Sequence, residues 1–254
     1  MTDKIVTAAV LVIGNEILSG RTRDTNMNWL AVELTALGIR LTEARVVADV
    51  EAAIIAAIND LRVQHDYVFT TGGIGPTHDD ITAESVAKAF GVPLVRDPEA
   101  VRRLQAHYAN PADLNEARLR MANIPEGATL IDNPISKAPG FRIGNVHVMA
   151  GVPAIMQAMF DGLRQALKGG APLLSRTVDA DLAEGAMAER LAAIQRVHPA
   201  VEIGSYPRMR QGKPSAAIVL RSIDPVLLGH AAEAVKAMMR ALGGEPREDT
   251  GSRG

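Results

Sequence analysis

The sequence predicts an α/β protein with a three-layer domain around a mostly parallel sheet, followed by a small α+β domain. Short apolar runs alternate with stretches of helical spacing through the first two thirds of the chain. Hydrophobic residues make up 47% of the chain and aromatic residues only 3%, which suits the aliphatic interior of such a domain. This alternation of strands and helices predicts a parallel sheet covered by helices on both faces.

The first part of the chain contains three strand–helix pairs. Residues 6–13 form a continuous apolar run, as expected of a strand buried on both faces. Gly38 and Gly91 each follow a stretch of helical spacing, where glycine commonly ends a helix. The expected strands are 6–13, 39–47 and 67–70, and the expected helices are 26–37, a segment after Asp49 with Ile54, Ile58 and Leu61 on one face, and 82–90.

The rest of the chain extends this domain and adds a second one. Pro98 suits the first position of a helix, and Gly144-Asn145 suits the turn of a hairpin between 141–143 and 146–149. Further elements are expected at 98–109, 114–121, 129–131 and 151–167, and then at 174–178, 182–197, 201–206, 216–222 and 225–242. Residues 168–172 read as a linker. We therefore expect an α/β domain at 1–168, a small β-α-β-β-α domain at 173–243 and a disordered polar tail at 244–254.

Composition narrows the functional classes. The formal net charge is −2 and the pI about 6.3, so no overall basic field points to nucleic acid or to a membrane surface. The sequence contains no cysteine, which excludes disulfides and thiolate chemistry. No apolar run approaches the roughly 18 residues of a membrane span, and the N-terminus lacks the features of a signal peptide. We expect a cytoplasmic protein.

Residues 67–81 are the strongest functional signal. A short strand leads into Gly72-Gly73-Ile74-Gly75-Pro76, and a helical pattern begins after Ile81. Strand, glycine-rich turn and helix form a familiar anion-binding arrangement, because turned N–H groups and a helix N-terminus favour negative charge. Two adjacent carboxylates, Asp79 and Asp80, would repel a phosphate unless a cation lay between them. The alternative is a plain turn in which these acids cap the following helix.

Several further polar residues are expected at the same sheet edge, because ligands of open α/β sheets bind beyond the carboxyl ends of the strands. Asp49 has a competing interpretation as a helix N-cap, and Asp24 or Thr25 is a candidate cap for the first helix. The predicted site residues for phosphate or nucleotide are Ser19, Asp24, Thr25, Asn26, Thr71, Gly72, Gly73, Gly75, Pro76 and Thr77, and those for a metal are Asp49, Asp79 and Asp80.

These motifs resemble the competence/damage-inducible protein A family, whose molybdopterin-binding-like (MoaB/MogA-like) domain is also related to the N-terminal domain of FAD synthases. The resemblance is strong over about residues 5–167 and weaker in the second domain. This chain is too short to hold the C-terminal amidase (amidohydrolase) domain that many members carry. The matching segments are GNEILSGRTRDTN from Gly14, ARVVADV from Ala44, TTGGIGPTHDDIT from Thr70, KAPGF from Lys137, VMAGVP from Val148 and VEIGSYP from Val201.

The resemblance implies metal-dependent hydrolysis of a nucleotide pyrophosphate, with ADP-ribose first among the candidates. Asp79, Asp80 and Asp49 would hold a divalent ion such as Mg²⁺, Mn²⁺ or Co²⁺, with potassium as a further candidate ion, and Lys137 would stabilise charge in the transition state. Ile74 and His78 depart from the molybdopterin branch of the family, so molybdopterin is not favoured as the cofactor. The alternative is a nucleotide- or pterin-binding protein that does not catalyse a reaction.

Nucleic acid, a membrane and a second copy of the chain are the other candidate partners. The second domain could bind RNA in the manner of a KH domain through three basic residues, Arg208, Arg210 and Lys213. However, the MRQGKP hairpin lacks the GXXG clamp of KH domains, and the chain is net acidic. Nucleic acid is therefore disfavoured as a partner, and no membrane is expected. Related domains self-associate, so the resemblance implies a homo-oligomer.

Overall fold

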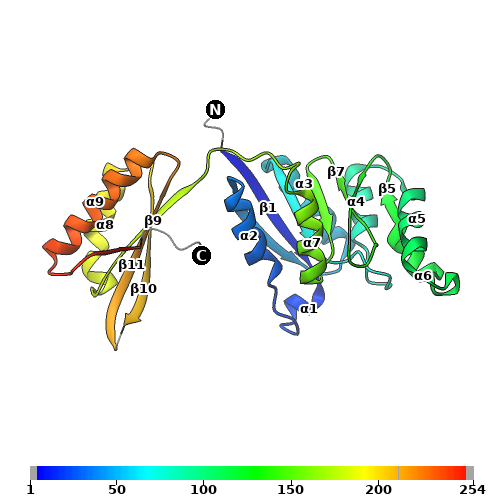
Figure 1. Ribbon diagram of the computed structural model, residues 1–254, viewed down its shortest axis with the longest axis horizontal. Helices are drawn as coiled ribbons and strands as arrows, with labels where there is room; N and C mark the ends of the chain where they lie inside the picture. Colours follow the sequence, from blue (N-terminus) through cyan, green and yellow to red (C-terminus); the bar gives the residue numbers. More distant parts are fainter. Residues whose placement is uncertain (1–4, 211, 250–254) are drawn as a thin grey trace. The chain divides into compact units, whose positions relative to one another are not determined.

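A computed structural model describes residues 5–210 and 212–249 of the protein. The chain divides into two compact units, Met1–Gly170 and Ala171–Gly254. We describe each unit by itself, because their relative positions are not determined (Figure 1).

Unit 1 contains a six-stranded sheet in the order β2-β1-β3-β8-β7-β6. The pairs β1–β2, β1–β3 and β3–β8 are parallel, whereas β7 runs antiparallel to both of its neighbours. The strands are β1 (Val6–Ile13), β2 (Ile39–Val47), β3 (Tyr67–Thr71), β6 (Thr129–Ile131), β7 (Gly140–Ile143) and β8 (Val146–Met149). The predicted α/β fold with a mostly parallel sheet is confirmed.

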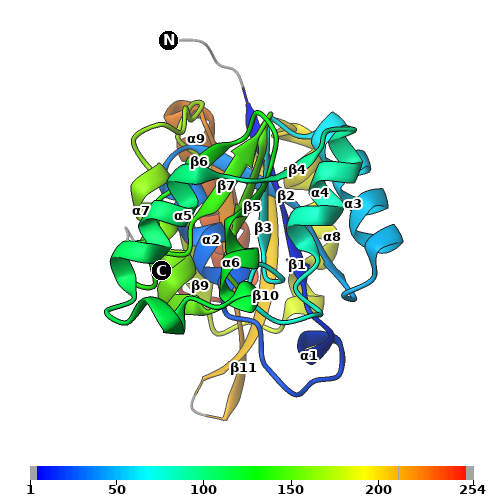
Figure 2. The same cartoon turned by 90° about the vertical axis from the view of Figure 1, so that its right-hand side faces the viewer.

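Helices cover both faces of this sheet, as the strand–helix alternation predicted (Figure 2). On one face α2 (Asn26–Ala36) and α7 (Pro153–Leu163) bury leucines, methionines and Phe160. On the other face α3 (Glu51–Gln64), α4 (Thr82–Phe90) and α5 (Pro98–His107) close a second apolar core.

Unit 1 also contains elements that the sequence pattern did not indicate. The loop after β1 begins with a short helix, α1 (Asn15–Leu18). β4 (Leu94–Arg96) and β5 (Asn123–Pro125) form a separate antiparallel pair. The helix expected at 114–121 is shorter and broken into α6 (Glu116–Leu119) and η2 (Arg120–Ala122), and a further short turn of helix, η1 (Pro111–Asp113), precedes it. These segments are too short for hydrophobic periodicity to distinguish them from loops.

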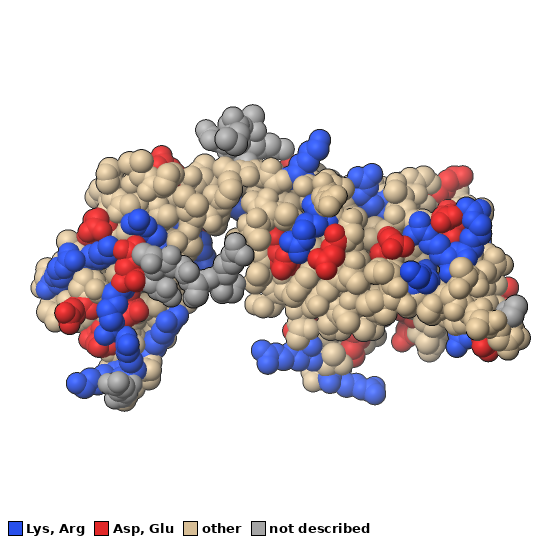
Figure 3. Space-filling model, in the orientation of Figure 1, with Lys and Arg blue, Asp and Glu red and all other residues tan. Residues whose placement is uncertain are grey.

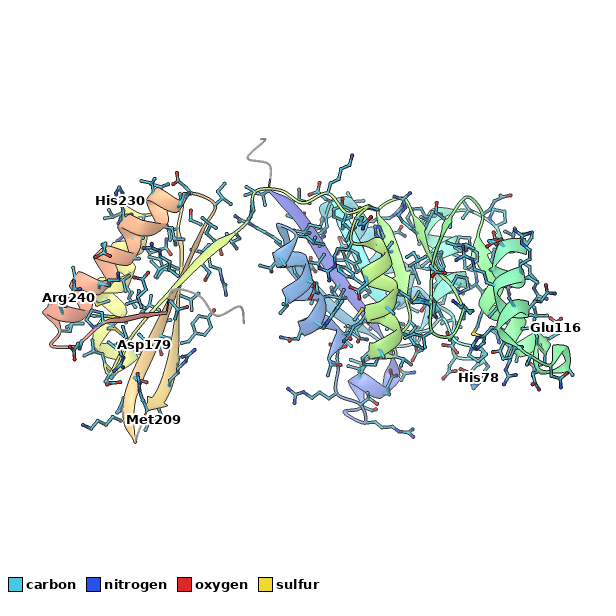
Figure 4. The ribbon with its side chains drawn as sticks, in the orientation of Figure 1. His78, Glu116, Asp179, Met209, His230 and Arg240 are labelled. Carbon is cyan, nitrogen blue, oxygen red and sulfur yellow. The ribbon has the colours of Figure 1, made fainter. Side chains whose placement is uncertain are left out.

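Unit 2 is an antiparallel sheet in the order β10-β11-β9-β12 with two helices packed on one face (Figure 1). Its elements are β9 (Leu174–Ala180), α8 (Glu184–Val197), β10 (Glu202–Arg210), β11 (Lys213–Ser222), α9 (Pro225–Ala241) and β12 (Arg247–Asp249). The predicted α+β character is confirmed. The hairpin strands extend further than expected, and Met209 lies near their tip (Figure 4).

The tail is a correction. We expected residues 244–254 to be disordered, but β12 pairs with β9. Its polar residues are held by ion pairs, because Arg247 contacts both Asp179 and Asp181, and Glu248 contacts Lys236. A polar composition therefore did not mean disorder here. Residues 250–254 lie outside the described residues. No described helix combines the length and the apolar character needed to cross a bilayer.

Candidate functional site

The strand ends bring the predicted loops to one edge of unit 1. In the parallel register Val12 lies beside Thr71 and Ile13 beside Val47, so β1, β2 and β3 end together. β8 ends at the same edge, and so does β6, which is parallel to β8 because both are antiparallel to β7. The loops after all five strands therefore lie along one edge of the sheet, the edge at which ligands of open α/β sheets bind. Figure 4 shows His78 at this edge.

The glycine turn after β3 requires glycine at two positions. Gly72 and Gly73 have φ values of +105° and +68°, where side chains are strained. A Cβ on Gly72 would lie 2.1 Å from the Ile13 carbonyl oxygen, and one on Gly73 would lie 2.2 Å from the Thr82 hydroxyl. That hydroxyl donates to the Gly72 carbonyl at 3.0 Å. The first turn of α4 thus holds the glycine turn in place.

The turn leaves three consecutive amides available. The Gly72 N–H donates to the Met149 carbonyl at 3.2 Å, so its predicted role as a phosphate donor is wrong. By contrast, within residues 5–210 and 212–249 the N–H groups of Gly73, Ile74 and Gly75 donate no hydrogen bond. Pro76 has no N–H and closes this run. Adjacent unpaired amides of this kind form a nest for an anion.

Asp80 is fixed within the same loop. Its Oδ2 accepts the Thr77 N–H at 2.8 Å and also the Thr77 hydroxyl. It packs against Gly75, where a Cβ would lie 2.6 Å from Oδ2. The interpretation of Asp80 or Asp79 as a cap for the next helix is wrong, because the N-cap of α4 is Ile81 with no side-chain cap.

Asp79 is exposed beside Asp80 and His78. The Thr77 hydroxyl lowers the pKa of Asp79, and its own backbone N–H and the nearby His78 act in the same direction. A hydroxyl carries one hydrogen, so the two carboxylates compete for that of Thr77, and the geometry assigns it to Asp80. The backbone N–H of Asp79 and the nearby His78 still lower the pKa of Asp79, so its carboxylate stays ionised across the neutral range.

Asp49 connects two of the loops at this edge and does not cap a helix. Its Oδ2 accepts the Asn15 N–H at 2.8 Å, which joins the loop after β2 to the loop after β1. The N-cap of α3 is Val50, so the capping interpretation of Asp49 is wrong. In the described part of the chain no three acidic or histidine side chains form a metal-holding group, so Asp49 does not join Asp79 and Asp80 in one.

A small pocket opens on the α2 and α7 side of this edge. Asp24, Thr25, Asn26 and Thr71 line it, as do Gly151 and Pro153. Asn26 is 4% exposed and its Nδ2 donates to the Gly151 carbonyl at 2.7 Å. Asp24, not Thr25, bonds the start of α2, through the Met27 N–H at 3.0 Å. Ser19 lies outside the pocket lining, and its hydroxyl donates to the Glu16 carbonyl.

Lys137 lies on the loop between β6 and β7, at the same edge. It is half-buried and has a φ of +60°, which is uncommon for a residue other than glycine. The buried side chain of Asn133 builds this loop: Oδ1 accepts the N–H groups of Ile135 and Ser136, and Nδ2 donates to the Ala138 carbonyl. The sequence analysis missed Asn133, and a lone Asn in a loop gives no signal of such a role.

Arg23 is a second residue that the sequence analysis missed. The acidic residues expected at this edge have a basic neighbour, because Arg23 lines the pocket together with Glu16 and Asp24. Basic side chains project from the loop after α1, which holds Arg21 and Arg23 (Figure 3). Their position in a GNEILSGRTRDTN segment between two strands was a signal that could have been used.

Comparisons with known proteins agree with this architecture. The family described as "probable molybdopterin binding domain" matches residues 9–169, and the middle domain of FAD synthase matches residues 172–243. A protein of Pyrobaculum calidifontis is 36% identical over 212 residues, covering 80% of this chain and 81% of its own. A "CinA-like protein" of Salinibacter ruber is 34% identical over 203 residues, which is 75% of this chain but 49% of that protein.

One solved structure is similar in both sequence and fold. The crystal structure of "the protein CinA with unknown function" from Thermoplasma acidophilum is 36% identical, with a TM-score of 0.60, and covers 64% of this chain and 98% of that one. The match to the molybdopterin-binding domain spans more than half of this chain. This chain therefore belongs to the CinA family of proteins with a molybdopterin-binding-like domain.

Proposed function

We propose that the protein hydrolyses a nucleotide pyrophosphate in a metal-dependent reaction, with ADP-ribose as the first candidate substrate. The observation that carries this proposal is the loop after β3. It offers three unpaired amides at Gly73, Ile74 and Gly75 and, within five residues, two carboxylates. Amides suit phosphate oxygens, whereas carboxylates suit the cation that accompanies them.

The donor set fits a hard divalent ion that binds together with the substrate. Asp79 and Asp80 supply carboxylate oxygens, and Mg²⁺ is commonly held by one or two carboxylates plus substrate phosphates and water. Such a site needs no third acid. When bound, the ion would neutralise phosphate charge and lower the pKa of a bound water. Asp49 acts in this proposal by holding the loop after β1 through Asn15.

The residues of the chain would position an in-line attack. Water attacks one phosphorus, the bond from that phosphorus to the bridging oxygen breaks, and ADP-ribose gives AMP and ribose 5-phosphate. The amides of the glycine turn would hold the phosphate that is not attacked. Lys137 would place positive charge near the leaving oxygen, since among the described residues it has no acidic partner to neutralise it.

A second candidate is binding without turnover. The family description favours it, because a molybdopterin-binding domain is named for a ligand and not for a reaction. The same amides and acceptors would serve a nucleotide or a pterin. Self-association also remains part of the proposal, and sedimentation velocity on the purified protein tests it.

The deciding experiment measures AMP release from ADP-ribose, FAD and NAD with Mg²⁺, Mn²⁺ or Co²⁺, and with EDTA as the control. Metal-dependent AMP from ADP-ribose supports the hydrolase. Tight binding of a nucleotide or pterin by calorimetry, with no product from any of the three, would replace the hydrolase with a binding protein.

A further inference from the structure

The pocket beside α2 is rich in hydrogen-bond acceptors. The carboxylates of Glu16 and Asp24 line it, together with Asn26 and Thr71. Carboxylates repel phosphate oxygens, but they accept hydrogen bonds from hydroxyl groups. This lining differs from the neighbouring glycine turn, where the unpaired backbone groups are the N–H donors of Gly73, Ile74 and Gly75. The two halves of the edge are therefore suited to different parts of a ligand.

The protein itself fixes the orientation of the Asn26 amide. Nδ2 donates to the Gly151 carbonyl at 2.7 Å, and a carbonyl can only accept, so the amide oxygen cannot take that position. Oδ1 is consequently left buried and without a hydrogen-bond partner in the described structure. A buried acceptor is costly when it is unpaired. A ligand that donates a hydrogen bond to it would remove that cost.

Thr71 also places a buried, unpaired polar atom in the same pocket. It is 1% exposed, and its Oγ1 is also buried without a partner among the described residues. A threonine hydroxyl can both donate and accept, so it matches a second hydroxyl of a ligand. Thr71 directly precedes Gly72, which places these hydroxyl-binding atoms next to the anion nest of the glycine turn.

Arg23 adds a positive charge to the pocket lining. Its side chain is exposed and has no ion-pair partner within the described ranges. An unpaired guanidinium is suited to a phosphate oxygen. A ligand that fits must therefore carry hydroxyl groups close to a phosphate.

We propose that this pocket binds the ribose of a ribosyl phosphate. Asn26 Oδ1 accepts a hydrogen bond from one ribose hydroxyl, and Thr71 Oγ1 donates to or accepts from another. Arg23 contacts the phosphate. This assignment rests on the proposed nucleotide ligand of the glycine turn and names the part of it that lies under α2. It makes Asn26 and Thr71 sugar-binding residues and not phosphate-binding ones.

Two neighbouring threonines provide a matched test. Thr70 and Thr71 are consecutive in β3, so their side chains point to opposite faces of the sheet. Both are fully buried and both have a hydroxyl without a partner, but only Thr71 lines the pocket. Thr71→Val and Thr70→Val each remove one unpaired hydroxyl at nearly constant volume. Both variants should fold, and they differ only in the face of the sheet from which the hydroxyl is removed.

The measurement is calorimetric titration of the full chain with ribose 5-phosphate and, separately, with inorganic phosphate, in EDTA and without turnover. We expect ribose 5-phosphate to bind more tightly than phosphate, and Thr71→Val to weaken its binding by roughly 3- to 10-fold, the loss of one hydrogen bond. Thr70→Val should leave the affinity unchanged. Arg23→Gln should weaken both probes by a similar factor, whereas Arg21→Gln, outside the pocket lining, should not.

Three outcomes would each overturn the ribose assignment. They are equal effects of Thr70→Val and Thr71→Val, equal affinity for the two probes, and no binding of ribose 5-phosphate. Failure of the proposed function looks different: the ribose site would survive these titrations while no AMP is released from ADP-ribose.

Discussion

Thr77 donates two hydrogen bonds to one oxygen of Asp80, from its backbone N–H at 2.8 Å and from its hydroxyl. Oδ2 is thereby occupied, and Oδ1 remains for a cation or a water. We predict that Thr77→Val lowers turnover of the pyrophosphate substrate by about tenfold, since a hydrogen bond to a charged group contributes roughly 1.5 kcal/mol. Thr77→Ser keeps the hydroxyl and should retain most of the activity.

Asp80→Asn tests the carboxylate itself. The amide has nearly the same shape, and its oxygen can still accept from Thr77, so we expect the melting temperature to change little. Turnover of ADP-ribose should fall by at least about 100-fold, because a neutral ligand binds a hard cation poorly. Glu126→Gln, which neutralises an exposed acid on a turn elsewhere in unit 1, is the control. Normal hydrolysis by Asp80→Asn would exclude Asp80 from the mechanism.

Two glycine substitutions separate positioning from folding. Gly75→Ala puts a Cβ 2.6 Å from Asp80 Oδ2, which can be displaced from Thr77 without moving the backbone, so we expect lost activity with little loss of stability. Gly73→Ala needs a φ of +68° and meets the Thr82 hydroxyl, so it should also destabilise unit 1 by roughly 1–3 kcal/mol. Urea denaturation beside the hydrolysis assay distinguishes them. An active Gly75→Ala would mean that Asp80 need not be held where it lies.

The parts of the fold that the sequence predicted are those with long, regular patterns. β1 is apolar at every position except Thr7 because both of its faces are covered, and α4 ends at Gly91, which takes the left-handed conformation expected of a C-terminal glycine. β12 was missed because ion pairs and not apolar burial hold it to β9. No local composition signals a strand whose stability comes from residues almost 70 positions away.

The convergence of the loops at one sheet edge could be predicted from the sequence, but the pairing of each residue there could not. The topological rule placed the loops after β1 and β3 together, and the structure does so. Whether a given amide or oxygen is already paired depends on distant atoms: Gly72 donates to Met149, and Asp49 accepts from Asn15. Such pairings set which groups remain for a ligand, and they follow only from the folded chain.

His147 provides a test of stability that is independent of the site. It is 3% exposed on β8, and its ring stacks on Phe69 with centroids 5.0 Å apart. Burial lowers the pKa of His147 to about 4, and the charge of Arg142 adds to this shift. Between pH 6.5 and pH 4 the unfolded chain binds a proton that the folded chain does not. Stability should therefore fall as the pH falls through this window.

The expected loss from this group between pH 7 and pH 5 is about 2 kcal/mol. His147→Phe should keep the stacking and remove this part of the pH dependence, and the Asn145 carbonyl retains its hydrogen bond from the Val68 N–H. Urea denaturation followed by the fluorescence of Trp29, the single tryptophan, reports on unit 1. His107→Gln, at an exposed position, is the control. If His147→Phe loses as much stability as the wild type between pH 7 and pH 5, a different buried group must be responsible for the acid sensitivity.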